Sequence, residues 1–329
     1  MFPRTGPVLA LAPMDGITDA PMRALMGATG AFDYAVTEFL RVSIEPLPAK
    51  VFRRDVPELA NGCRTRTGMP VQVQLLGGDP GRMATTAATA VRTGATSIDI
   101  NFGCPAPTVN RNDGGASLLR TPCRIREVVR AVREAVPQEI PVSAKLRLGW
   151  DDIDQIDENA AMAAEGGAEW ITIHARTRIA GYAPPVYWPK VGEVRARLGI
   201  PVVANGDIWT LDDFRRCQDE TGCERFMIGR GALANPDLPY QIARELGRDP
   251  GEWDGDWPGL LRALDSEVVR FSETIKTRTL FRAKQWLSLA SKFGDFDRFD
   301  EVKTCASFEG LLELLEAAQE PPMRRAANQ

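Results

Sequence analysis

The chain has 329 residues, of which 44% are hydrophobic, and a formal net charge of −4 from 40 basic and 44 acidic side chains. This composition is ordinary for a globular protein with a sizeable core. The overall charge does not indicate nucleic-acid binding, so any such site must be a local patch. No apolar run approaches the roughly 18 residues of a membrane span, and no membrane partner is expected.

The cysteines form neither a disulfide framework nor a metal-binding pattern. Six are scattered over the chain, and Cys217 and Cys223 lie six residues apart without a further ligand or a histidine nearby. Because the chain has a single histidine, no metal site is expected. Free thiols fit a reducing compartment, so we expect a cytoplasmic protein. The apolar stretch at residues 8–14 is short and contains Pro13, which favours a buried strand over a signal sequence.

Short apolar runs rich in β-branched residues alternate with helix-like segments over the first two thirds of the chain. The runs cover residues 8–14, 34–39, 71–77, 97–103, 142–149, 170–176, 202–208 and 225–231, and the helical segments include 124–135, 159–165 and 211–219. Eight repeats of strand and helix predict an α/β fold, a (β/α)₈ TIM barrel. The alternative is a doubly wound sheet, which usually has fewer strands and a glycine-rich phosphate loop after the first.

The composition changes after residue 234. The segments NPDLP (235–239) and RDPGEWDGDWPG (248–259) are rich in proline, glycine and aspartate, and three segments with helical periodicity follow. We predict a barrel in residues 1–240, a linker in 241–258, an all-helical C-terminal domain in 259–320 and a disordered tail in 321–329. The helices of this domain are expected at residues 260–274, 280–293 and 308–318.

Polar residues follow each predicted strand, at the end that a barrel turns toward its active-site face. They are Asp15, Glu38, Gln74, Asn101, Cys104, Lys145, Arg147, His174, Arg176, Asn205, Asp207 and Arg230. Residues 205–207 (Asn-Gly-Asp) and 229–231 (Gly-Arg-Gly) end the last two strands, where the loops of this fold often bind phosphate. Glycines also serve plain tight turns, but in a barrel these positions favour a phosphorylated cofactor.

Cys104 lies in the sequence Asn-Phe-Gly-Cys-Pro (101–105), directly after the fourth predicted strand. A cysteine more often fills a core than takes part in chemistry, but the flanking glycine and proline indicate a sharply shaped, accessible turn. A thiol with a pKa of roughly 8.5 stays protonated at neutral pH and can act as a general acid. Since no partner that would generate a thiolate is evident, we interpret Cys104 as an acid.

Three further polar residues lie within or directly after apolar strands. Lys145, inside a barrel, would need an anion such as a phosphate or a reduced flavin. A lone histidine is more often a hydrogen-bonded core residue than a ligand. The place of His174 at a strand end nevertheless favours a ligand role. Gln74 offers both a donor and an acceptor to the edge of a heterocycle.

The segment 276–292 is strongly basic. It contains Lys276, Arg278, Arg282, Lys284 and Lys292 and no acidic residue. Arg278 and Arg282 are four residues apart and therefore share one face of a helix. An ordinary solvated face is the default interpretation of such a run, but unopposed positive charge also indicates contact with a polyanion.

These motifs together resemble those of the tRNA-dihydrouridine synthases, in order along nearly the whole chain. The matching segments include APMDGITD (12–19), VQLLG (73–77), DINFGCP (99–105), GGASLL (114–119), KLRLGW (145–150), IHARTRIAGY (173–182), VVANGDIW (202–209) and MIGRGAL (227–233). RAKQWLS (282–288) and Arg41 are similar to the C-type subfamily, which acts on uridine 16 in the D-loop.

The resemblance implies an FMN-binding barrel and a helical domain that binds tRNA, in a monomer that uses NADPH as reductant. Hydride would pass from N5 of FMN to C6 of uridine, and Cys104 matches the cysteine that gives the proton to C5. The implied FMN contacts are Pro13, Met14, Asp15, Gln74, Lys145, His174, Asn205, Gly206, Asp207, Gly229 and Arg230. The positions implied to meet tRNA are Arg41, Asn101, Tyr182, Arg282 and Lys284.

Two positions depart from the family pattern, and two other functions stay open. Ala175 stands where the family often has glycine, and Pro107 replaces a common lysine after the cysteine motif. Both alter loops near the site, so the substrate contacts there are not fixed by the resemblance. An FMN barrel that reduces a free pyrimidine or another small molecule would explain the barrel but not the basic helical domain. A tRNA-binding protein without catalysis would be colourless when purified.

Overall fold

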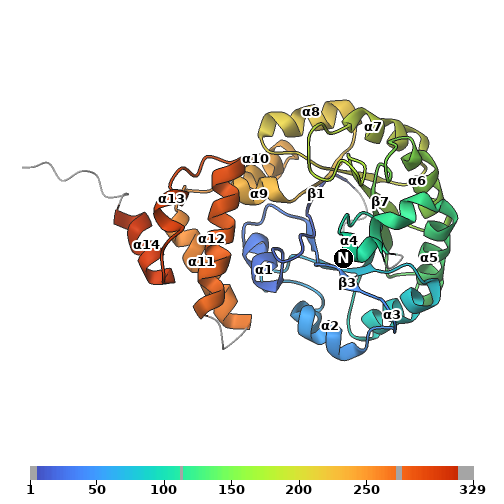
Figure 1. Cartoon of the computed structure of the whole chain (residues 1–329), viewed down its shortest axis with the longest axis horizontal. Coiled ribbons are helices and arrows are strands. Elements are labelled where there is room, and N and C mark those ends of the chain that lie inside the picture. The colour runs from blue at the N-terminus through green and yellow to red at the C-terminus, as the bar shows by residue number, and fades with distance from the viewer. Residues whose placement is uncertain (1–5, 112–113, 272–275, 318–329) are drawn as a thin grey trace, which may run out of the picture.

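The computed structural model describes residues 6–111, 114–271 and 276–317, with only the backbone at 276–278. Eight parallel strands close into a barrel (Figure 1), because β2 pairs with both β1 and β4. The strands are β1 (Val8–Leu11), β2 (Tyr34–Val36), β4 (Val71–Leu76), β5 (Ile98–Asn101), β6 (Val142–Arg147), β7 (Trp170–His174), β8 (Val202–Asn205) and β9 (Arg225–Ile228); β3 (Leu40–Arg41) adds to the edge of β4. The predicted TIM barrel is confirmed.

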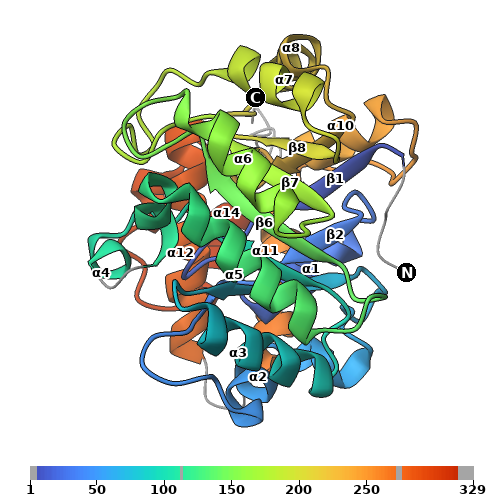
Figure 2. The same cartoon turned by 90° about the vertical axis from the view of Figure 1, so that its right-hand side faces the viewer.

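Helices cover the outside of the barrel, as the side view in Figure 2 shows for α3, α5 and α6. The long barrel helices are α1 (Ala20–Ala28), α2 (Ala49–Asp55), α3 (Pro80–Arg92), α5 (Pro122–Ala135), α6 (Gln155–Glu165), α7 (Trp188–Arg197), α8 (Leu211–Thr221) and α10 (Leu238–Glu245). In α5, the residues Ile125, Val128, Val129 and Val132 are fully buried. Their spacing places them on one helical face, which packs against the strands. The helices predicted at 124–135, 159–165 and 211–219 lie within α5, α6 and α8.

Each strand ends a few residues before the end of the apolar run that predicted it. The run at 97–103 contains β5, which ends at Asn101, and the run at 202–208 contains β8, which ends at Asn205. The remaining residues of each run leave the sheet and enter the loops above the C-terminal ends of the strands. These loops hold the short elements α4 (Pro107–Asn110), η2 (Gly115–Arg120) and α9 (Arg230–Ala234); η1 (Pro57–Asn61) follows α2. The active-site face of a TIM barrel is built from such loops.

The C-terminal helices form a separate unit beside the barrel, on the left of Figure 1. They are α11 (Trp257–Phe271), α12 (Lys276–Phe293), α13 (Phe299–Val302) and α14 (Phe308–Ala317). The predicted linker at 241–258 is shorter in the structure, because α10 continues the barrel to Glu245 and α11 begins at Trp257. The end of the helix predicted at 260–274 and the tail predicted at 321–329 lie outside the described residues.

The helical unit and the barrel share a continuous interface. The indole nitrogen of Trp286 donates a hydrogen bond to Leu233 O at 2.7 Å, and Arg282 donates to Ile17 O at 2.6 Å. Arg282 also forms an ion pair with Asp19, the residue that caps α1. The apolar core runs without a break from the barrel wall into α11, α12 and α14. Helix α12 is therefore anchored on the barrel beside α9, and α11 packs beside α1.

None of the helices within the described ranges is long and apolar enough to cross a membrane.

Candidate active site

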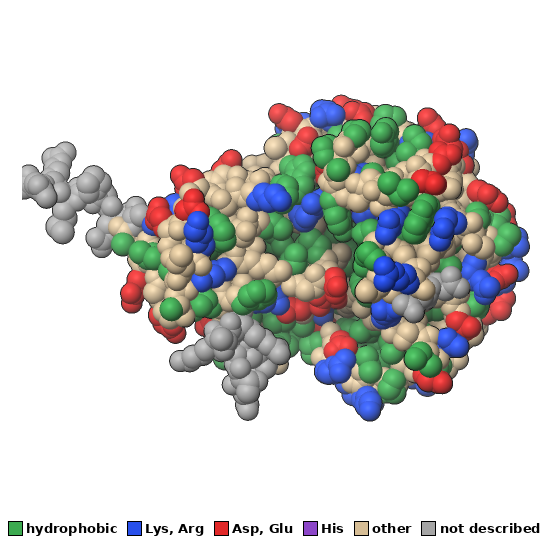
Figure 3. Space-filling model, in the orientation of Figure 1, with side chains coloured by type: hydrophobic (Ala, Val, Ile, Leu, Met, Phe, Trp, Pro, Cys, Tyr) green, Lys and Arg blue, Asp and Glu red, His purple; other side chains and the backbone are tan. Residues whose placement is uncertain are grey.

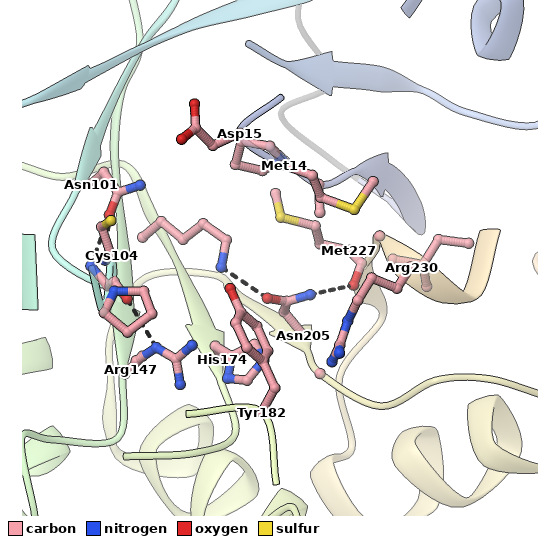
Figure 4. Close-up of a pocket in the computed structure, with 18 of the residues that line it drawn as sticks. Met14, Asp15, Asn101, Cys104, Arg147, His174, Tyr182, Asn205, Met227 and Arg230 are labelled. Carbon is pink, nitrogen blue, oxygen red and sulfur yellow. Dashed lines mark hydrogen bonds between the residues drawn. The ribbon is translucent and has the colours of Figure 1, made fainter. Parts of the chain in front are cut away.

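A cavity of about 380 Å³ opens at the C-terminal ends of the strands. This volume lies in the range of small-molecule and cofactor pockets. Fourteen of the residues predicted as site residues line it, namely Pro13, Met14, Asp15, Gln74, Asn101, Cys104, Lys145, His174, Tyr182, Asn205, Gly206, Asp207, Gly229 and Arg230. Figure 4 shows lining residues that converge on the cavity, with Cys104 and Arg230 on opposite sides.

Three of the predicted tRNA contacts do not line this cavity. Arg41 donates a hydrogen bond to Thr108 O at 3.1 Å and so holds the loop that carries α4. Lys284 donates to Cys305 O at 2.6 Å, within the helical unit. Arg282 is engaged by the barrel through the contacts described above. Arg282 and Lys284 therefore have structural partners, and their contact with tRNA stays a prediction. The side chains of Lys276 and Arg278 lie outside the described residues.

Cys104 is presented by a short loop after β5, residues 102–106, which we call the thiol loop. Asn101 Oδ1 accepts hydrogen bonds from the backbone nitrogens of Gly103 and Cys104, each at 2.9 Å. The carbonyl of Cys104 in turn accepts one from Ala116 N at 3.2 Å. Burial raises the pKa of the Cys104 thiol above its ordinary value. The thiol is therefore protonated at neutral pH, as a proton donor requires.

A chain of buried hydrogen bonds reaches the thiol loop from inside the barrel. Ser143 Oγ donates to Asp99 Oδ1, Gln74 Nε2 donates to Asp99 Oδ2 at 2.7 Å, and Asn101 Nδ2 donates to Gln74 Oε1 at 2.8 Å. Both ends of the Gln74 amide are thus engaged within the protein. Because Asp99 only accepts, each amide along the chain is fixed in one orientation. Asn101 must then present its oxygen to the thiol loop.

Arg147 joins the thiol loop to the loop after β7. Its Nε donates to Gly103 O at 2.9 Å, and its Nη1 donates to Thr177 O at 3.0 Å and to Gly181 O at 2.7 Å. The guanidinium carbon lies 5.2 Å from the centre of the Tyr182 ring. One buried cation therefore positions both the thiol loop and an aromatic residue at the edge of the cavity.

The cavity floor carries several cationic or potentially cationic groups. Lys145 Nζ donates to Asn205 Oδ1 at 2.8 Å, and burial, with help from Arg147, lowers the pKa of Lys145 to about 8. Burial and the neighbouring Arg147 and Lys145 charges hold the pKa of His174 well below 6.5, so the imidazole is neutral at neutral pH. Burial likewise lowers the pKa of Arg230. An anion bound here would offset both the desolvation and the mutual repulsion of these groups.

The cavity lining has groups that would suit a heterocycle with a phosphate, such as the FMN that the resemblance implies. His174 Nδ1 is buried without a hydrogen-bond partner among the described residues, so it is available to a ligand. A Cβ at Gly206 would lie 3.3 Å from His174 Nε2, and one at Gly229 would lie 3.1 Å from Met14 Sδ. Glycine therefore lets His174 and Met14 keep their places in the cavity lining at the ends of β8 and β9, where barrels commonly bind phosphate.

Arg230 lies among aromatic rings at the rim of the cavity. Its guanidinium carbon is 4.5 Å from the ring centre of Tyr182, 5.0 Å from that of Trp209 and 5.6 Å from that of Phe293. Trp209 and Phe293 stack on each other at 4.7 Å. Since Phe293 ends α12, the helical unit contributes to the rim of the barrel cavity.

Four residues that shape this site were not among the predicted site residues. The sequence gives no signal for Asp99, because it lies inside an apolar run, or for Trp209, because it lies in a loop. Arg147 and Arg176 appear only among the polar residues at strand ends, yet Arg176 forms a bidentate pair with Asp207. In the part of the chain that the structure describes, no cluster of three or more histidine, cysteine or acidic residues could hold a metal ion.

The chain matches a known protein family over most of its length. The profile of the family described as dihydrouridine synthase (Dus) matches residues 10–293. The chain is 44% identical over 312 residues to the tRNA-dihydrouridine(16) synthase of Shewanella oneidensis, covering 94% of this chain and 97% of the relative. For the synthase of the same name from Pseudomonas putida, the identity is 43% over 315 residues, with 92% and 96% covered. For that of Neisseria meningitidis serogroup A it is 41% over 313 residues, with 94% of each chain covered.

Solved structures with low sequence identity share the fold. Histamine dehydrogenase from Rhizobium sp. 4-9 aligns with a TM-score of 0.55 and 14% identity over 79% of this chain and 48% of that one. A 2-naphthoyl-CoA reductase aligns with a TM-score of 0.56 and 11% identity over 74% of this chain and 50% of that one. At these identities the similarity supports the barrel architecture alone.

Proposed function

Because the chain belongs to the dihydrouridine synthase family, we propose that it reduces the uridine at position 16 of tRNA to 5,6-dihydrouridine with a bound FMN. It is an oxidoreductase that acts on tRNA, as the relatives' shared name indicates. NADPH is the proposed reductant of the flavin, and the proposed setting is a monomer in the cytoplasm.

One juxtaposition carries the proposal. A protonated thiol, on Cys104, and the cationic group of Lys145 on the floor line the same cavity at the mouth of a barrel. The thiol suits the delivery of a proton, and the floor suits an anionic, phosphate-bearing cofactor. Neither a binding protein without catalysis nor an ordinary packing role would need both groups in one cavity.

The chemistry that these residues would support is the addition of two hydrogens across the C5=C6 bond of uracil. A bound, reduced FMN supplies a hydride for C6. Negative charge would then spread over C5 and the C4 oxygen, and C5 must take a proton. Cys104 would give that proton from its sulfur, and solvent would restore it afterwards. The protein thereby adds one hydride and one proton, which balances the conversion of uridine to dihydrouridine.

The other lining groups would act on binding and orientation. Lys145, with its charge close to the cavity, would favour the anionic form of a reduced cofactor. His174, held neutral, would offer its unpartnered nitrogen as a hydrogen-bonding group rather than as an acid. The target base must leave its stack to enter a cavity at a barrel mouth, so the uridine would be bound unstacked.

The test is an assay with purified, flavin-loaded protein and tRNA from a strain that lacks its own dihydrouridine synthases. We expect NADPH-dependent dihydrouridine at position 16, located by primer extension or mass spectrometry, and no turnover of free uridine. Dihydrouridine at another position would overturn the assignment of site 16. Reduction of free pyrimidines without reduction of tRNA would favour the small-molecule alternative, and a colourless protein that binds tRNA would favour binding without catalysis.

A further inference from the structure

Two arginines and a tryptophan form a group on the cavity face of the barrel. The guanidinium carbon of Arg120 lies 4.2 Å from the ring centre of Trp150, and that of Arg178 lies 4.6 Å from it. Arg120 ends η2 in the loop after β5, Trp150 follows β6, and Arg178 follows β7. Since the loops after parallel barrel strands share one face, the group lies on the same face as the cavity.

In the part of the chain that the structure describes, no acidic side chain pairs with the positive charges of this group. Among the described residues, Arg120 and Arg178 have no ion pair, and Arg178 Nε is buried without a hydrogen-bond partner. The carboxylates next to Trp150 in the sequence form no ion pair with either arginine among the described residues. Asp151 accepts from Gln155 Nε2 at 3.3 Å, and Asp152 accepts from the backbone of Asp154 at 2.9 Å. Two guanidinium groups over one indole repel each other until an anion is bound.

A second arginine–tryptophan contact in the same protein differs from this group because its arginine is paired with acidic residues. Arg216 lies over Trp188 at 5.3 Å, but it is also paired with Asp213 at 3.8 Å and Glu220 at 3.5 Å. That pair lies on α8, on the outside of the barrel, and its charge is balanced. Because the arginines over Trp150 lack such ion pairs among the described residues, packing alone does not account for their charge.

The geometry suits a phosphate. A guanidinium that stacks its face on an indole keeps its N–H edges free, and these edges match two phosphate oxygens at once. The loop is held in place by hydrogen bonds from Arg178 N to Gly149 O at 2.8 Å and from Ile179 N to Trp150 O at 2.9 Å. The site is therefore ordered before a ligand arrives, which limits the entropy that binding costs.

The position favours the backbone of RNA over a free anion. In Figure 3, Lys and Arg side chains gather beside the central hollow, over the region that Figure 1 labels α4 and β7. The loop that carries Arg178 also carries Tyr182, which lines the cavity, and Arg147 ties that loop to the thiol loop. A nucleotide whose base enters the cavity must lay its phosphodiester chain across this rim.

We propose that Arg120 and Arg178, held over Trp150, form a phosphate-binding site for the tRNA backbone next to the target uridine. The inference rests on the proposed function, since it takes tRNA as the substrate. It assigns contact with the tRNA backbone to the barrel rim, whereas the sequence alone predicts such contact for the basic helix α12. The phosphate of a reduced dinucleotide has the same chemistry, so the experiment must separate these two sources.

The experiment compares flavin-loaded Arg120→Gln, Arg178→Gln and the double variant with the wild type, using Arg216→Gln as the matched control. We expect each single variant to weaken tRNA binding severalfold and to lower the slope of log affinity against log salt by about 1, and the double variant by about 2. The control should leave both unchanged. Arg178→Lys should keep most of the slope, because it keeps the charge. Retained flavin absorbance and melting temperature verify folding.

Two outcomes would overturn the proposal. One is an unchanged salt slope in the double variant. The other is unchanged tRNA affinity together with a raised KM for NADPH, which would assign the site to the dinucleotide. The proposed function is judged separately, by whether the wild-type protein forms dihydrouridine in tRNA. If it does and the slopes do not change, only the site assignment fails.

Discussion

The side-chain oxygen of Asn101 lies 2.9 Å from the backbone nitrogen of Cys104, and this contact sets where the thiol sits. Asn101 is the last residue of β5, so the thiol loop is tied directly to the barrel wall. Its amide nitrogen is fixed by Gln74, and Gln74 is fixed by Asp99. The proposed acid is therefore positioned by groups buried inside the barrel rather than by its own flexible loop.

Replacing the thiol should separate the two halves of the reaction. Cys104→Ala should bind FMN and accept electrons from NADPH at the wild-type rate, but form dihydrouridine about 10²- to 10⁴-fold more slowly, because C5 lacks its acid. Single-turnover reaction of the pre-reduced enzyme with tRNA measures this step. Cys123→Ala, at an exposed cysteine on α5, is the control. Wild-type turnover by Cys104→Ala would remove Cys104 from the mechanism.

Breaking the buried hydrogen-bond chain should slow the reaction without touching a reacting group. Asp99→Leu leaves Gln74 and Asn101 free to reorient, and we expect the rate of dihydrouridine formation per bound flavin to fall about 10- to 100-fold. Asp99→Asn is the conservative control. Its oxygen can still accept from Gln74 while its amide faces the rotatable hydroxyl of Ser143, so most activity should remain.

The two Asp99 variants together distinguish hydrogen bonding from charge. Equal loss in both would assign the effect to the negative charge of Asp99, which raises the pKa of Lys145. Wild-type rates in Asp99→Leu, after correction for flavin content, would show that the chain does not position Cys104.

The buried amine of Lys145 should give the flavin-free protein a distinct pH dependence. Its pKa of about 8 in the folded state lies below the ordinary 10.5, so between these values the unfolded chain binds more protons. The free energy of unfolding should therefore rise with pH across this window. Relative to Lys145→Met, the wild type should gain on the order of 2–3 kcal/mol between pH 8 and pH 10.5.

Denaturant unfolding of the flavin-free proteins at several pH values measures this gain. Lys50→Met, at an exposed lysine on α2, is the control and should follow the wild-type curve. Parallel curves for the wild type and Lys145→Met would contradict a lowered pKa for Lys145.

The contact between Arg282 and Asp19 should contribute to the stability of the whole chain. In a double-mutant cycle with Arg282→Met and Asp19→Asn, we expect a coupling energy of about 1–2 kcal/mol, because the charged hydrogen bonds between them are partly shielded from water. Thermal or denaturant unfolding of the four proteins gives this value. A coupling near zero, with weakened tRNA binding in Arg282→Met, would instead support the tRNA contact predicted from sequence.

Most of the fold could be predicted from the sequence, because strands and helices alternate with distinct apolar patterns. The eight runs contain the eight barrel strands. Strand lengths and the domain boundary were less accessible. A run such as 97–103 continues apolar beyond Asn101 because the loop residue Phe102 is also buried. Helix α10 crosses the predicted boundary because its proline-rich start resembles a linker.

The site was predictable where it depends on strand ends, and not where it depends on register. Polar residues at the ends of strands meet in any barrel, which is why so many of the predicted residues line one cavity. The partnership of Gln74 with Asp99 depends on the pairing of β4 with β5, which a single sequence does not contain. Likewise, Asp19 lies 263 residues from Arg282, so the charge on α12 looked unopposed.

The shared core between barrel and helical unit limits how this enzyme can be rearranged. Trp286 is fully packed against the barrel and donates to Leu233 O, and a Cβ at Gly294 would lie 2.0 Å from Ala234 O. Such close packing requires a matching surface on the barrel. The C-terminal helices therefore cannot be transferred unchanged to another barrel of this family, because the contacting surface of that barrel would have to be redesigned at the same time.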